Sequence, residues 1–104
     1  MNINTFNTSL LGSKSVIYVQ GKFDSATRQK FNDAMRDAVS HANSTEIEVH
    51  LGAANYIDSA ACGMLLLLKK LASEAGKTVA LSNATGAVKT VLSLMNFEKL
   101  FAIR

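Results

Sequence analysis

The residues best placed to do chemistry in this chain are Asp58 and Ser59. They lie between a strand end at Tyr56-Ile57 and the long apolar segment Met64–Leu68. This arrangement predicts a serine hydroxyl at the amino end of a helix, where free backbone N–H groups and the helix dipole favour an anion. A phosphate group is the natural candidate. The chemistry would then be done to the protein and not by it.

Two roles for Ser59 are compatible with this pattern. Its hydroxyl can cap the helix, the commonest task of a serine at such a position. Alternatively Asp58 is the cap, and Ser59 is the first helical residue with its hydroxyl facing outward. A phosphate there would be favoured by the dipole by roughly 0.3–1 kcal/mol and opposed by the charge of Asp58. The fold should therefore survive phosphorylation, while any partner surface over this turn would change.

Other chemistry has little support in the sequence. Cys62 lies one turn into the same helix, but neither His41 nor His50 is near it in sequence, so a small packing residue is expected there. The two histidines lack the spacing of a metal site. Ser59 has no Gly-x-Ser-x-Gly elbow around it, and the glycines form no phosphate-binding loop. The sequence thus predicts no catalytic residue, no metal, no cofactor and no enzyme.

The composition favours one compact domain over residues 1–104. Apolar residues make up 48% and charged residues 18% of the chain, and proline is absent. A single cysteine suits a reducing cytoplasm, and no signal peptide is recognisable. The longest apolar run, Met64–Leu68, is far shorter than the roughly 20 residues of a membrane helix, so no membrane insertion is expected. The net charge is +3, but the basic residues are scattered along the sequence, and this indicates no nucleic-acid partner.

Strand and helix patterns alternate along the chain. The expected strands cover 3–10, 14–20, 46–51 and 77–82, and the expected helices begin near Asp24-Ser25, at Ser59 and after a cap at Asn83. The order predicts an α/β fold: a mixed, mostly parallel sheet of four to five strands, with an antiparallel N-terminal edge hairpin, packed by three to four helices. The turns at 21–24 and 55–59 should lie side by side at strand carboxyl ends.

Several segments, in order, resemble the STAS domain (SpoIIAA-like fold), and among its members the stand-alone anti-sigma factor antagonists of bacteria. The similarity covers nearly the whole chain. The most specific part is the Asp58-Ser59 motif with the helix start that follows it. The segments that carry the similarity are Gly21-x-Phe23-Asp24, Ile47–Leu51, Ile57-Asp58-Ser59-x-x-x-Gly63-Met64-Leu65 and Val91-Leu92…Phe97…Leu100-Phe101.

The resemblance implies a regulatory cycle. An unmodified antagonist binds an anti-sigma factor or switch-protein serine kinase; phosphorylation of the serine after the aspartate releases it, and a PP2C-type phosphatase restores binding. Carried over, Ser59 is the phosphoacceptor. Independently of the resemblance, a single core accounts for the apolar positions, so the free protein is expected to be a monomer. The implied partner-binding residues are Asp24, Ser25, Asp58, Ser59, Ala60, Ala61 and Met64.

This chain departs from the usual pattern just after the serine. Ala60 stands where a second hydroxyl residue is common, so Ser59 is the single acceptor of the turn. Ala61 stands where glycine is common, which changes the detail of the interface. The small side chains of Ala60, Ala61 and Gly63 allow close approach by either a neighbouring strand or a partner's backbone.

Two further functions remain compatible with the sequence. One is a non-switching STAS subunit that stabilises the ATPase of an ABC-type lipid transporter, with Ser59 in a static interface. The other is binding of a small ligand or nucleotide at the loops near Ser59.

Overall fold

A computed structural model describes residues 6–104. The described residues form five strands and three α-helices, with two short 3-10 turns, η1 (Ser25–Thr27) and η2 (Phe97–Lys99). The strands are β1 (Phe6–Leu11), β2 (Lys14–Phe23), β3 (Glu46–Ile57), β4 (Thr78–Ser82) and β5 (Ala102–Ile103). The helices are α1 (Arg28–Ser40), α2 (Ser59–Glu74) and α3 (Gly86–Leu94).

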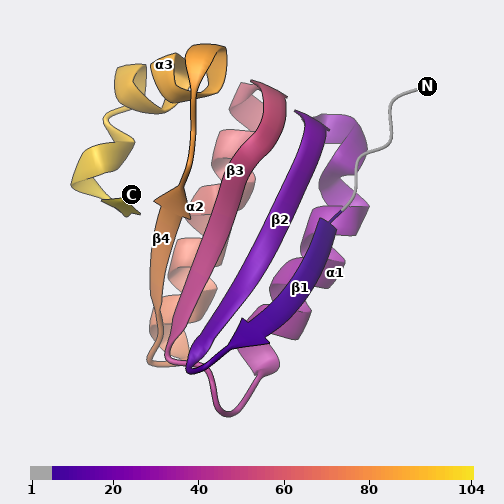
Figure 1. The fold of residues 1–104 in the computed structure, drawn as a ribbon, viewed down its shortest axis with the longest axis vertical. Coiled ribbons are helices and arrows are strands. Elements are labelled where there is room, and N and C mark those ends of the chain that lie inside the picture. The colour runs from indigo at the N-terminus through magenta and orange to yellow at the C-terminus, as the bar shows by residue number, and fades with distance from the viewer. Residues whose placement is uncertain (1–5) are drawn as a thin grey trace.

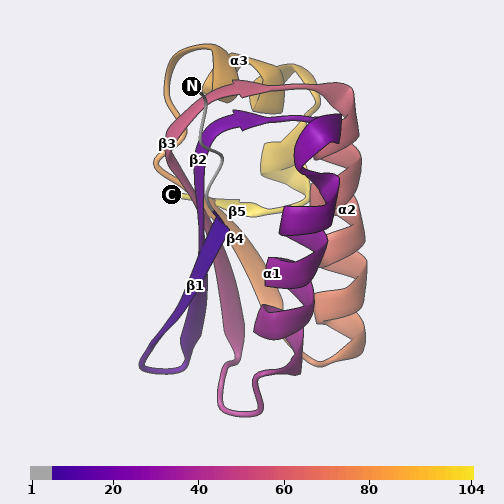
Figure 2. The ribbon, with the colours of Figure 1, turned by 90° about the vertical axis from the view of Figure 1, so that its right-hand side faces the viewer.

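The strands form one sheet in the order β1-β2-β3-β4-β5, as seen face-on in Figure 1. β1 pairs with β2 antiparallel, and every other pair is parallel. Helices α1 and α2 cover the same face of the sheet, whereas α3 lies near the carboxyl end of β3 (Figure 2). The predicted fold class, including the antiparallel edge hairpin, is confirmed.

The core lies between the sheet and helices α1 and α2. Alternate residues of β3 point into it, and Ile47, Val49 and Leu51 are fully buried. Phe31 on α1 and Leu65 on α2 meet them from the helical layer and are also fully buried. Period-two burial in the strand and helical spacing in the helices therefore agree on one core.

The structure corrects the predicted boundaries of several elements. β3 runs unbroken from Glu46 to Ile57, so the predicted strand 46–51 and the predicted strand end at Tyr56-Ile57 belong to one element. Irregular pairing with β2 carries it past the break in its apolar alternation at Gly52. β5 was not predicted as a strand. The cap of α3 is Thr85 and not Asn83, whose φ of 60° is left-handed and leaves it in the preceding loop. Residues 3–5 of the first predicted strand lie outside the described part.

The partly buried side chain of Lys77 contacts the end of α1. The Lys77 ammonium group donates hydrogen bonds to the carbonyls of Ala38 and His41 and to the hydroxyl of Ser44, the last at 2.8 Å. The last carbonyls of a helix have no partner within the helix, so a basic side chain from the start of β4 satisfies them. This contact fixes α1 against the parallel sheet.

The face of the sheet opposite the helices carries a network of charges. Lys14 on β2 forms an ion pair with Glu48 on β3 at 2.8 Å, and the Ser82 hydroxyl on β4 donates to the same carboxylate at 2.6 Å. The pKa of Glu48 is lowered, first by the bond from Lys14 and then by that from Ser82. Three neighbouring strands are thereby joined across the face of the sheet opposite the helices.

Candidate functional site

Two neighbouring strand ends bring the candidate site together. Phe23 at the end of β2 is the register partner of Ile57 at the end of β3, and the backbone N–H of Asp58 donates to the Phe23 carbonyl at 3.3 Å. Asp24 and Asp58, the next residue on each strand, therefore leave the sheet beside each other. This confirms the expectation that the two turns are adjacent.

Each aspartate then caps the helical turn that follows it. The Oδ1 atom of Asp58 accepts from the Ala61 N–H at 2.9 Å, and that of Asp24 accepts from the Ala26 N–H at 3.1 Å. Thr27 completes a capping box, because its hydroxyl oxygen accepts from the Asp24 N–H at 3.2 Å. Both turns are thus held by side chains with strong capping preference.

Ser59 is the first residue of α2, and its side chain is exposed. Of the two roles open from the sequence, the structure shows Asp58 as the cap and Ser59 as the exposed first residue of the helix. Within residues 6–104 the Ser59 hydroxyl makes no hydrogen bond. The first turn of α2 contains no acidic residue, so the helix dipole favours an added phosphate, while Asp58 before it opposes one.

The structure changes two of the predicted partner contacts. Ala61 is 0% exposed and Met64 is 2% exposed, so neither offers its side chain to a partner. They lie three residues apart on the inward stripe of α2 and pack into the core. The remaining predicted contacts are at least partly accessible: Asp24, Ser25, Asp58, Ser59 and Ala60.

Sequence reasoning missed a pair of side chains next to this turn. Tyr56, two residues before Asp58, is 45% exposed. Its register partner is Lys22, whose Nζ atom lies 5.8 Å from the centre of the Tyr56 ring. The signal was parity along the strand: Ile57 points into the core, so Tyr56 must point away from it. An exposed tyrosine is a frequent anchor of protein interfaces.

Cys62 has no nucleophilic role in this geometry. Its side chain is 1% exposed, and its pKa is raised, first by burial and then by the charge of Asp58. A thiol in such surroundings stays protonated and unreactive. In the described part of the chain, no three potential metal ligands gather into a group, and no helix is long and apolar enough to cross a membrane.

A search of protein families matches residues 6–102 to the family model described as "Mlab, STAS domain". The chain belongs to the STAS domain family. A STAS-domain containing protein of Pseudomonas aeruginosa (strain UCBPP-PA14) is 39% identical to it over 92 residues, which cover 88% of this chain and 89% of the relative.

Solved structures share the fold of this STAS domain. An anti-sigma factor antagonist from Mycobacterium paratuberculosis superposes with a TM-score of 0.84 at 17% identity, covering 95% of this chain and 83% of its own. Unphosphorylated SpoIIAA, also an anti-sigma factor antagonist, gives 0.74 at 16% identity, with coverages of 96% and 87%. The phosphorylated Bacillus SpoIIAA gives 0.72 at 15% identity, with coverages of 96% and 91%.

Proposed function

We propose that this STAS domain is an anti-sigma factor antagonist that works by partner switching. The unmodified domain binds an anti-sigma factor or switch-protein serine kinase over the surface formed by the two adjacent turns that begin at Asp24 and at Asp58. Phosphorylation of Ser59 by the kinase releases the partner, and a PP2C-type phosphatase restores binding. The domain itself catalyses no reaction in this scheme and requires no cofactor.

The observation that carries this proposal is the environment of the Ser59 hydroxyl. It is exposed, makes no hydrogen bond within the described residues, and stands at the start of a 16-residue helix that Asp58 already caps. Its modification therefore leaves the cap intact. A phosphate would add roughly 1.5–2 negative charges next to two capping carboxylates, which changes the surface far more than the fold.

The surroundings of Ser59 suit a protein partner better than a small molecule. Ala60, next to Ser59, has a small side chain, and Tyr56, three residues before Ser59, is an exposed aromatic residue. A partner can thus cover the hydroxyl directly and take an anchor from the tyrosine. A charged phosphate at the centre of such a contact would be desolvated next to the carboxylate of Asp58, and this cost weakens binding.

A second function, left open by the sequence, is compatible with the match to the family model described as "Mlab, STAS domain". In this alternative the domain is a non-switching subunit that stabilises the ATPase of an ABC-type lipid transporter. The same surface would then be a permanent interface, and charge at Ser59 would have no regulatory role.

A capture experiment with four forms of the protein separates the two functions. Wild type, Ser59→Ala, Ser59→Asp and the control Ser73→Asp serve as baits in lysate of the native cell. Ser73 is an exposed serine near the other end of α2, so it reports the effect of an added carboxylate alone. Partner switching predicts that an anti-sigma factor or serine kinase binds wild type, Ser59→Ala and Ser73→Asp, and is depleted on Ser59→Asp.

An ATPase subunit captured equally by all four baits would instead support the transporter function. A kinase captured equally by all four would show that charge at Ser59 does not control docking, and would refute the switch.

A further inference from the structure

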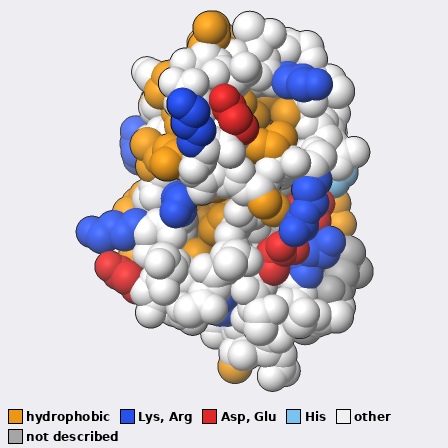
Figure 3. Space-filling view, turned by 90° about the vertical axis from the view of Figure 1, so that its left-hand side faces the viewer, with side chains coloured by type: hydrophobic (Ala, Val, Ile, Leu, Met, Phe, Trp, Pro, Cys, Tyr) orange, Lys and Arg blue, Asp and Glu red, His pale blue; other side chains and the backbone are white. Residues whose placement is uncertain are grey.

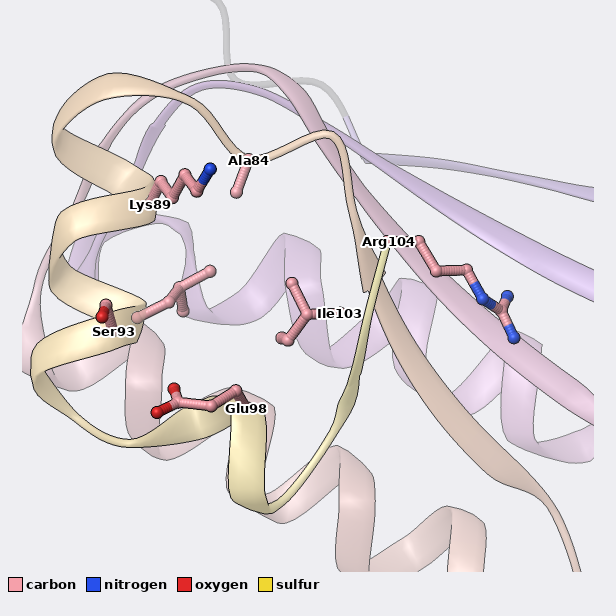
Figure 4. A pocket seen from close by; sticks show the side chains of 7 residues that line it. Ala84, Lys89, Ser93, Glu98, Ile103 and Arg104 are labelled. Carbon is pink, nitrogen blue, oxygen red and sulfur yellow. The ribbon is translucent and has the colours of Figure 1, made fainter.

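A pocket of about 450 Å³ opens beside β5, on the edge of the molecule viewed in Figure 3. Ser93 of α3 lines one side of it, and Ile103 of β5 lines the other (Figure 4). Leu92 of α3 also lines the pocket. Its size falls within the roughly 300–1,000 Å³ that is usual for binding sites. None of its lining residues belongs to the surface around Ser59.

The same strand presents an open backbone edge. β5 is the last strand of the sheet, and among residues 6–104 its one pairing partner is β4. The N–H of Arg104 donates to the Leu81 carbonyl at 2.9 Å, and its carbonyl accepts from the Asn83 N–H at 3.0 Å. Successive residues of a strand direct these groups to opposite edges, so the N–H and carbonyl of Ile103 point away from β4. Such a free edge is a template for another strand.

Charged side chains lie at the rim of the pocket, whereas its floor is apolar. The Arg104 guanidinium is held by both carboxylate oxygens of Glu46, at 2.9 and 2.7 Å, and points away from the pocket (Figure 4). Lys89 on α3 and Glu98 on η2 flank the pocket and form no ion pair within residues 6–104. An apolar floor thus lies between one free cation and one free anion.

The geometry points to a second docking site, in which an extended segment of a partner protein pairs with the free edge of β5 and inserts one apolar side chain into the pocket. An extended segment is the occupant that fits, because Ile103 both lines the pocket and carries the backbone groups that point away from β4. A strand added in this register has alternate side chains facing the layer that contains the pocket. Polar groups of the segment would meet Lys89 and Glu98 at the rim.

A phage-displayed library of random peptides, selected on the full-length protein, provides the probe. The expected result is a consensus with one large apolar residue and no net charge requirement. An enriched peptide, made synthetically, should shift the amide signals of β5 and α3 in two-dimensional NMR spectra. The proposal fails if no peptide is enriched over several rounds, or if the shifts fall elsewhere.

Two variants test the two parts of the contact separately. Ser93→Phe fills the pocket from α3, and Ile103→Pro removes the outward N–H without removing a bond to β4. Each variant should weaken binding of the peptide by at least about tenfold. The matched controls are Ala87→Phe, on an exposed part of α3 that does not line the pocket, and Ile103→Val, which keeps the N–H; both should bind as wild type does.

Three outcomes would overturn the proposal. Equal binding to Ile103→Pro would show that no strand pairing occurs, and equal binding to Ser93→Phe would show that the pocket is not used. A concentration-dependent dimer in sedimentation velocity, abolished by Ile103→Pro, would identify a second copy of this chain as the occupant. Phosphomimetic substitution at Ser59 should leave peptide binding unchanged, so this test is independent of partner switching.

Discussion

Alanine substitutions at Asp58 and Ser59 should have opposite consequences, although the two residues are adjacent. Asp58 accepts the Ala61 N–H at 2.9 Å and caps α2, so Asp58→Ala should lower the free energy of unfolding by about 1 kcal/mol, within a range of about 0.5–2. Ser59 is exposed and its hydroxyl makes no bond among the described residues, so Ser59→Ala should change it by less than about 0.5 kcal/mol.

Urea unfolding at neutral pH, followed by circular dichroism, measures both effects. In a chain of 104 residues, a loss of 1 kcal/mol corresponds to a fall in melting temperature of about 4–8 °C. Asp58→Asn serves as the control, because asparagine caps about as well as aspartate and should stay close to wild type. The cap assignment is refuted if Ser59→Ala is the more destabilising alanine variant, or if Asp58→Asn loses as much as Asp58→Ala.

Three further results are expected. Lys77→Met should lower the free energy of unfolding by about 1–3 kcal/mol, because three acceptors near the end of α1 lose their donor. The control Lys70→Met, on the exposed side of α2, should lower it little. Equal losses for the two variants in urea unfolding would contradict this prediction. The pKa of Glu48 is lowered in the folded state, so its contribution to stability is present above its ordinary pKa of 4.5 and is lost as the pH falls through the folded-state pKa. In Glu48→Gln the free energy of unfolding should therefore fall less steeply as the solution is acidified. An unchanged slope of that free energy against pH would contradict this prediction. Cys62 should react with a thiol reagent only as fast as the protein opens, and rapid labelling of the native protein would contradict its burial.

The fold was largely readable from the sequence because each core element repeats its apolar residues at its own period. The alternation of Ile47, Val49 and Leu51 and the helical spacing around Phe31 are examples. What escaped prediction depends on contacts distant in sequence. β5 is two residues long and is a strand only because β4 lies beside it, and the left-handed backbone of Asn83 belongs to the loop that follows β4.

The candidate site was readable in part for a similar reason. Aspartates that directly follow apolar strands, as Asp24 and Asp58 do, indicate helix starts at the same end of a parallel sheet. The inward position of Ala61 could also be predicted from the sequence, because Ala61 lies four residues before the core residue Leu65 and so on the same face of the helix. Tyr56 was missed because the alternation of apolar residues stops at Leu51, and the irregular pairing with β2 beyond it decides on which face Tyr56 lies.

The most direct test of the switch is a phosphate map of the protein isolated from its native cell in the partner-bound and the free state. Peptide mass spectrometry should find phosphate on Ser59 in the free fraction and an unmodified Ser59 in the bound fraction. Phosphate at Ser59 in the bound fraction, or release of the partner while Ser59 carries no phosphate, would contradict the proposal that charge at this hydroxyl governs docking.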